Sequence, residues 1–205
     1  MTTLIIARHG NTFDPDETPR RVGAATDLPL VEKGREQAQR LGEYLKQNSL
    51  VPDVVYSSAL MRTQETAKIA IKAAGYSQPV YALDIFNEID YGPDENKTED
   101  EVVARLGEQA LADWDEKAIV PEGWRVSPDE VIKNWCAFAD QIRIHDDGET
   151  VLVVTSNGIA RFAPHITGDF ETFAKDNKIK ISTGALCIFE HGADGWTIKE
   201  WNVKP

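Results

Sequence analysis

Four side chains that can bind or react with an anionic group lie just after predicted strands. Arg8 and His9 directly follow the apolar run TLIIA, residues 3–7. Arg62 lies on the first helical turn after DVVYSS, residues 53–58, and Glu88 follows a possible third strand, PVYAL. In an open parallel sheet, ligands bind beyond the carboxyl ends of the strands. We therefore expect one histidine, two arginines and one carboxylate to converge on a single crevice.

This set of residue types predicts phosphoryl transfer. A neutral imidazole is a competent nucleophile toward phosphorus, and the covalent phosphohistidine divides one difficult step into two. Guanidinium groups bind phosphate oxygens in a bidentate manner. A carboxylic acid protonates the leaving oxygen and then takes a proton from the attacking water. These roles fall to His9, to Arg8 with Arg62, and to Glu88, and we expect no metal ion or other cofactor.

Five more residues are candidates for binding the substrate. Gly10 has no side chain, so its backbone can approach a phosphate closely. Asn11 and Thr12 follow it in a long polar loop. Ser156 and Asn157 follow the apolar strand TVLVVT and begin a new helix, whose first N–H groups suit an anion.

The elements that must position these residues alternate between strands and helices. Short apolar runs predict strands over 3–7, 53–58 and 150–156, with a further one at 79–83, and a closing hairpin over 185–191 and 196–203. Helical patterns cover about 30–48, 60–75, 98–117 and 128–143. Such alternation predicts an α/β fold, a three-layer α/β/α sandwich with a mostly parallel sheet and one antiparallel edge strand. We expect one domain, residues 1–205, with a small helical lid insertion at about 90–127.

Composition narrows the classes of partner. The net charge of −12 argues against a nucleic-acid partner, which requires a basic face, but a few convergent arginines still make one pocket positive. No apolar run approaches the ~20 residues of a membrane span, and no secretory leader is recognisable. We expect a cytoplasmic protein with no membrane association and a small phosphorylated substrate. A phosphoprotein substrate and a homodimer are compatible with the sequence.

Five blocks of the chain resemble one known family. They are RHG, DLPLVEKGREQA, SSALMRTQETA, NEIDYG and VLVVTSNGIARF, and they occur in the order and spacing of the histidine phosphatase superfamily, the phosphoglycerate mutase-like proteins. The resemblance implies that His9 is the phosphorylated nucleophile. It also implies that Arg8 and Arg62 clamp the phosphoryl oxygens and that Glu88 donates a proton. Relatives often have a phosphate-contacting arginine in the long loop, where this chain has both Arg20 and Arg21; we take Arg21 as the candidate and leave the choice open.

The chain departs from the family at the later core strand. Relatives carry a second histidine there, in THGG, whereas this chain has TSNG with Ser156 in its place. Three interpretations stay open. Ser156 and the following N–H groups hold the phosphate and catalysis survives; another histidine substitutes, with His145 expected at the far end of the strand and His165 nearer; or only ligand binding remains.

A second departure bears on the reaction. In the mutases that this chain resembles, paired arginines follow a tryptophan, but here Asp115 and Glu116 follow Trp114. Like charges repel, so acids do not replace arginines opposite a multiply anionic substrate. The gap from Tyr91 to Lys97 is also shorter than in the mutases. We therefore favour hydrolysis of a phosphomonoester over a phosphoglycerate mutase reaction, and over a binding protein without turnover.

Overall fold

A computed structural model describes residues 1–145 and 148–205 of the chain. The strands are β1 (Thr2–Arg8), β2 (Val54–Ser57), β3 (Val80–Ala82), β4 (Thr150–Thr155), β5 (Leu186–Gly192) and β6 (Gly195–Val203). The α-helices are α1 (Glu32–Gln47), α2 (Met61–Ala73), α3 (Glu99–Leu106), α4 (Glu108–Lys117), α5 (Pro128–His145), α6 (Asn157–Ala160) and α7 (Phe170–Asp176). Three short 3-10 helices join them, η1 (Asp84–Phe86), η2 (Gly92–Asp94) and η3 (Ala163–Thr167).

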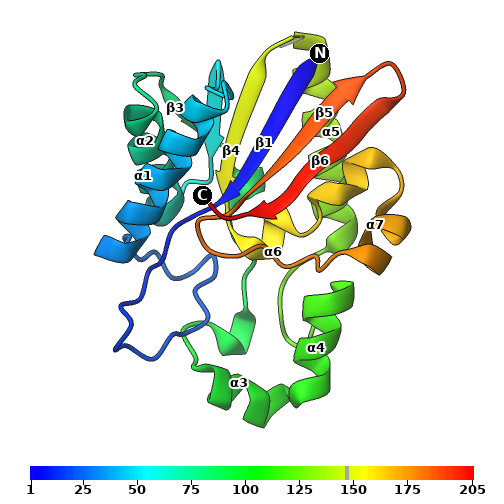
Figure 1. The fold of residues 1–205 in the computed structure, drawn as a ribbon. Helices are drawn as coiled ribbons and strands as arrows, with labels where there is room; N and C mark the ends of the chain where they lie inside the picture. The colour runs from blue at the N-terminus through cyan, green and yellow to red at the C-terminus, as the bar shows by residue number, and fades with distance from the viewer. Residues whose placement is uncertain (146–147) are drawn as a thin grey trace.

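The six strands form one sheet in the order β3-β2-β4-β1-β5-β6 (Figure 1). β1, β2, β3 and β4 pair in parallel, and antiparallel pairing is confined to the edge made by β5 and β6. Arg8 stands opposite Thr155, and Ser57 stands opposite Val154, so the carboxyl ends of β1, β2 and β4 are level. The sheet therefore delivers the residues that follow these strands to one edge.

Two apolar clusters cover the two faces of the sheet, which makes the three layers. Ile5 and Ala7 of β1 pack in one cluster with buried residues of α1 and α2. Leu4 and Ile6 point the other way, into a cluster with α5 and the segments after β4. This alternation is the two-residue period of a strand buried on both faces. The predicted α/β/α sandwich is confirmed.

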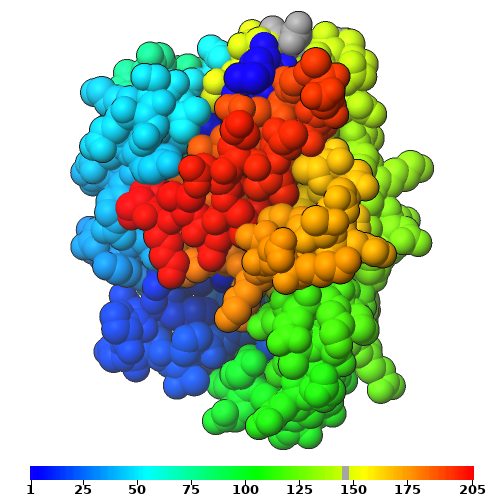
Figure 2. All heavy atoms as spheres, turned by 45° about the vertical axis from the view of Figure 1, so that its right-hand side comes forward, coloured from blue at the N-terminus to red at the C-terminus, as the bar shows by residue number. Residues whose placement is uncertain are grey.

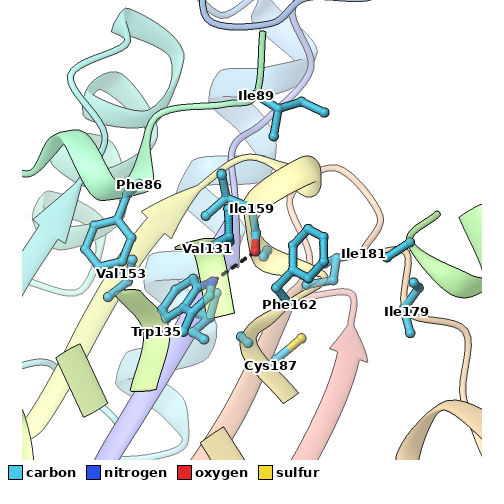
Figure 3. Close-up of a cluster of buried hydrophobic side chains, with 14 of the residues drawn as sticks. Phe86, Ile89, Val131, Trp135, Val153, Ile159, Phe162, Ile179, Ile181 and Cys187 are labelled. Atoms are coloured by element: carbon cyan, nitrogen blue, oxygen red, sulfur yellow. Dashed lines mark hydrogen bonds between the residues drawn. The ribbon is translucent and has the colours of Figure 1, made fainter. Parts of the chain in front are cut away.

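The second cluster also fixes the segments that carry the candidate site (Figure 3). Phe86 and Ile89 flank Glu88, and both are buried in it. The indole N–H of Trp135 donates to the carbonyl of Ile159 at 2.9 Å and thereby ties α5 to α6. Buried backbone groups need hydrogen-bond partners, and this bond satisfies the Ile159 carbonyl. It thereby holds the turn after β4 in one position against α5.

The segment between Asp90 and Arg125, which we call the lid, projects beyond the carboxyl ends of the strands and carries α3 and α4 (Figure 1). Its two ends meet in an antiparallel bridge, with the Arg125 N–H donating to the Asp90 carbonyl at 2.8 Å and an ion pair at 3.0 Å. The single helix predicted over 98–117 is wrong in one respect: Gly107, at φ 81°, divides it into α3 and α4.

The long loop of residues 11–31 lies against this lid. The N–H of Arg21 donates to the Lys97 carbonyl, and the N–H of Asn96 donates back to the Arg21 carbonyl, both at 2.8 Å. Figure 2 shows this loop in blue and the lid in green at the same end of the molecule. Two segments that are distant in sequence thus form one wall beside the sheet edge.

Among the described residues, no helix is both long and apolar enough to cross a membrane. The same residues include no group of three or more histidine, cysteine or acidic side chains placed to hold a metal ion. Cys136 and Cys187 are both free thiols.

Candidate active site

A cavity of about 800 Å³ opens at the carboxyl ends of the strands, between the sheet, the long loop and the lid. Seven residues predicted from the sequence line it: Arg8, His9, Asn11, Thr12, Arg21, Glu88 and Asn157. Gly10, Arg62 and Ser156 do not line it. Arg62 and Ser156 have no exposed surface, which places them inside the protein rather than on the cavity wall.

His9 is held by its backbone and by one ring nitrogen. Its N–H donates to the Thr155 carbonyl at 3.1 Å, and its own carbonyl accepts from the Gly184 N–H at 3.1 Å. The ring Nδ1 lies 2.7 Å from the Gly10 carbonyl. A carbonyl only accepts, so Nδ1 carries the proton and the Nε2 lone pair is left free. The side chain is 7% exposed, and that small surface lies on the cavity.

The charge state of the imidazole follows from its surroundings. Burial lowers the pKa of His9 well below its ordinary value, and the positive charges of Arg62 and then Arg8 lower it further. The Nδ1 contact with Gly10 opposes these effects. The ring is therefore neutral near pH 7, which is the form that attacks phosphorus.

The two arginines are both anchored, in different ways. Arg8 donates from Nη1 to the Ile181 carbonyl at 2.7 Å. Arg62 donates from Nη1 to the Thr26 carbonyl at 2.9 Å and from Nη2 to the carbonyls of Val22 and Gly23. The Nε atoms of both are buried without a partner. Desolvation lowers the pKa of both guanidinium groups, and the nearby charge of Glu88 opposes that shift.

Glu88 is buried, and its two oxygens are held from different directions. Oε1 accepts from the Ile89 N–H at 2.9 Å, and Oε2 accepts from the Gly158 N–H at 3.2 Å, at the first turn of α6. The Tyr91 hydroxyl lies 3.5 Å from Oε2, and burial raises the pKa of Tyr91 beyond its ordinary range, so this phenol stays protonated. Asp94, in the same acidic segment, is also buried; it pairs with Arg105 and accepts from the Trp124 indole N–H.

Gly158 is the residue that makes room for this carboxylate. A Cβ at position 158 would overlap Oε1 of Glu88. We expect Gly158→Ala to displace Glu88 and to lower kcat by about 10²-fold, the cost of a misplacement of about 1 Å. Gly192→Ala is the matched control, because a Cβ there meets no atom within 4 Å. Steady-state rates of the two variants check this, and equal rates would contradict it.

Packing also constrains Gly10, whose predicted place beside a phosphate stays a prediction. A Cβ at position 10 would overlap the carbonyl oxygen of Gly34 in α1, so packing requires glycine here. Its N–H donates to the Thr66 hydroxyl at 3.1 Å and is already used. Asn11 donates its N–H to Gln37, which leaves its side chain on the cavity wall.

A family model described as "Histidine phosphatase superfamily (branch 1)" matches residues 4–204. The chain belongs to the histidine phosphatase superfamily. This is the family that the five sequence blocks resemble.

Relatives in this superfamily carry two kinds of name. A 2,3-bisphosphoglycerate-dependent phosphoglycerate mutase of Clavibacter michiganensis is 37% identical over 120 residues, which are 58% of this chain and 47% of the relative, so the match spans about half its length. The mutase 2 of Gloeobacter violaceus is 28% identical over 95% of this chain and 88% of its own. The structure of a mycobacterial glucosyl-3-phosphoglycerate phosphatase superposes with a TM-score of 0.79, covers 99% of both chains and is 20% identical, which establishes the fold alone.

Ser156, the residue predicted to replace the second histidine of relatives, lies at the N-terminus of α6. Ser156 is fully buried, and its hydroxyl has no hydrogen-bond partner among the described residues. Its carbonyl accepts from Ala160 at 2.9 Å, while Asn157 accepts from the Ile181 N–H through Oδ1. His165 stacks on Phe170 at 3.9 Å and is not on the cavity. The side chain of His145 lies outside what the structure describes.

Three cations on the cavity, Lys33, Arg161 and Lys180, were not anticipated from the sequence. Arg161 lies on the turn after α6, is 1% exposed, and stacks over the Trp114 ring at 4.0 Å. Asp115 lies 3.5 Å from Arg161 and 2.7 Å from Lys180. Thus the acid that follows Trp114 is balanced by two cations. An arginine four residues after Asn157, within the apolar stretch GIARFA, was the available signal.

The loop arginines and the lid lysine are now placed. Arg20 and Arg21 both line the cavity. Arg21 pairs with Glu99 at 2.7 Å and lies over the rings of Tyr91 and Trp124, whereas Arg20 is exposed and has no ion pair within the described chain. Lys97 pairs with Glu101 and is not on the cavity.

The lowered pKa of His9 has a measurable consequence. We expect the His9 ring in the folded protein to remain neutral as the pH falls through about 6.5, where a free imidazole takes up its proton. The unfolded chain binds that proton first, so this group's contribution to the free energy of unfolding decreases as pH falls below about 6.5. Ring-nitrogen NMR shifts of His9, followed from pH 8 to pH 5, check the first statement; a midpoint at or above 6.5 would be inconsistent with it.

Proposed function

We propose that the protein hydrolyses a phosphomonoester through a phosphohistidine on His9. The observation that carries the proposal is the neutral His9 ring on the cavity wall, with Nδ1 tied to Gly10 and Nε2 free. Membership of a superfamily of phosphoryl-transfer enzymes supports it.

The first proposed step forms a bond between His9 Nε2 and phosphorus and breaks the ester P–O bond. Arg8 stabilises the charge on the equatorial oxygens, Arg62 adds its positive charge from behind the cavity wall, and protonated Glu88 gives its proton to the leaving oxygen. In the second step, water attacks phosphorus, the P–N bond breaks, and the Glu88 carboxylate takes the water's proton. His9 returns to its neutral form, and inorganic phosphate leaves.

The decisive experiment is a panel of phosphomonoesters combined with rapid-quench trapping. We expect turnover of at least one ester and an acid-labile, alkali-stable phosphoenzyme that accumulates in the first milliseconds. Mapping of the label to the peptide containing His9 completes the test. No turnover and no trapped phosphoenzyme across the panel would overturn the proposal.

A phosphoglycerate mutase reaction is the second candidate. It is favoured by the names of the relatives and by the cations Arg161 and Lys180 on the cavity. Because Asp115 is already paired with both, the net charge that they offer a second anionic group is reduced. Conversion of one phosphoglycerate isomer into the other would establish the mutase, whereas release of phosphate alone supports hydrolysis.

Ser156 separates an active enzyme from a protein that only binds. If the buried Ser156 hydroxyl donates to the phosphoryl group, Ser156→Ala lowers kcat by about 10-fold to 10²-fold, and this is the result we expect. The same change removes an unpartnered buried hydroxyl, so the free energy of unfolding stays equal or rises. Parallel measurement of kcat and thermal midpoint checks both. Unchanged kcat would refute the proposed contact; phosphate binding without turnover in the wild type would leave only a binding protein.

The setting proposed for this activity is the cytoplasm, with a small phosphorylated molecule as substrate. The cavity of about 800 Å³ holds such a ligand and is lined by both acids and bases. A phosphoprotein is the alternative substrate, and a homodimer is compatible with this proposal.

A further inference from the structure

A second, smaller cavity lies beside the candidate active site. Its volume is about 380 Å³, and it lies where the chain after α7 meets the end of β6. In Figure 2 these two segments, in orange and red, meet on the face shown, above the loop of residues 11–31. Its lining residues are Arg8, Lys178, Lys180, Ile181, Ser182, Thr183, Asn202 and Lys204.

The charge of this cavity is opposite to that of the molecule. Four cationic side chains line it, and no described carboxylate does, although the chain carries a net charge of −12. Lys180 is paired with Asp115 at 2.7 Å, while Lys178 and Lys204 have no ion pair within the described chain. Unpaired like charges that face one hollow repel each other, so their gathering favours an anion as occupant.

The remaining lining groups also suit an anion. Ser182 and Thr183 add hydroxyl donors, and the side chain of Asn202 is held by the Ser182 N–H, which donates to its Oδ1 at 2.7 Å. That contact leaves the Asn202 amide nitrogen free to donate. Ammonium and hydroxyl donors around a cavity of this size match a tetrahedral oxyanion better than an apolar group.

Arg8 connects this cavity with the active-site cavity. Arg8, Lys180 and Thr183 line both. Arg8 is fixed by its bond to the Ile181 carbonyl, and its Nε is buried without a partner. An anion in the second cavity therefore lies on the other side of the arginine that faces His9.

We propose that the second cavity is a binding site for a phosphate-type anion distinct from the phosphoryl group at His9. The anion is either a second phosphoryl group of the substrate or free inorganic phosphate. The site is built from Lys178, Lys204 and the hydroxyl donors, and it does not depend on turnover at His9.

The test compares charge reversal at this cavity with the same reversal elsewhere. The variant is Lys178→Glu with Lys204→Glu, and the matched control is Lys72→Glu with Lys133→Glu, two exposed lysines on α2 and α5. Both pairs change the net charge by the same amount, and thermal unfolding checks that both variants fold. Titration calorimetry with inorganic phosphate at low ionic strength measures binding.

We expect two phosphate-binding events per chain in the wild type and in the control. In the variant we expect one of them to weaken at least about tenfold, because two attractive charges become repulsive. If the variant and the control bind phosphate alike, the proposal is overturned. A wild type with one event, lost in the variant, would support this site and count against phosphate binding at His9.

A pair of substrates then identifies the source of the anion. In the wild type, preference for propane-1,3-diyl bisphosphate over propyl phosphate that is lost in the variant assigns the site to the substrate's second phosphoryl group. An unchanged preference, with weakened phosphate binding, assigns it to free phosphate. Absence of turnover with either ester would count against the proposed function. The calorimetric comparison of variant and control would still test the second anion site.

Discussion

His9→Ala lowers kcat/KM for phosphomonoester hydrolysis by at least about 10⁴-fold and abolishes the trapped phosphoenzyme. Removal of a covalent nucleophile has effects of this size in enzymes whose remaining residues still bind and polarise the substrate. Arg8 and Arg62 keep their own anchors at Ile181 and at the carbonyls of residues 22–26, so phosphate affinity changes much less than the rate. Rapid-quench kinetics and phosphate titration of the variant measure the two quantities separately.

The matched control is His165→Ala. His165 is a half-buried histidine in η3, after α6. Its ring stacks on Phe170 and does not line the cavity. Its removal is expected to lower the thermal midpoint without lowering kcat of the folded fraction. A His9→Ala variant that keeps wild-type turnover, or that still accumulates an acid-labile phosphoenzyme, would exclude His9 as the nucleophile.

Glu88→Gln is expected to lower kcat by about 10²-fold to 10⁴-fold for alkyl phosphates, the range for loss of a general acid and base. Glutamine retains one acceptor for the N–H groups of Ile89 and Gly158 but has no acidic proton to give. The loss depends on the leaving group. An alkoxide requires protonation, whereas p-nitrophenolate departs without it, so the first step is spared for p-nitrophenyl phosphate.

The comparison of propyl phosphate with p-nitrophenyl phosphate checks this role. Glu17→Gln is the control, since Glu17 is another carboxylate of the same cavity that lies in the exposed loop. We expect the Glu88 variant alone to show a large difference between the two esters. An equal loss for both esters would indicate a positioning role for Glu88 instead.

The sequence predicted the sheet and the edge at which the reactive residues meet, because both depend on local patterns. Apolar runs of strand length end at Arg8, Ser57 and Thr155, and parallel pairing in register brings these ends together. The alternating order of strands and helices was enough to predict the three layers. Arg8, His9 and Glu88 follow from the same reasoning, since each stands just beyond a strand or its candidate.

Local sequence patterns do not predict contacts between segments that are distant in the chain. The overlap between Gly10 and Gly34 depends on how α1 packs on β1, and the need for glycine at position 158 depends on where Glu88 arrives. In the sequence, Arg161 is a single charge in an apolar stretch. Its contact with the Trp114 ring is visible only in the structure. The division at Gly107 also reflects the path that the lid must take, since helical periodicity continues on both sides of it.

The bridge between Asp90 and Arg125 brings the two ends of a 34-residue excursion to one point, so that only two backbone crossings attach it to the sheet. Tyr91 and Trp114 within this excursion contact Glu88 and Arg161, so its composition also shapes the cavity. Grafting residues 91–124 from a relative of different specificity offers a direct route to redesign.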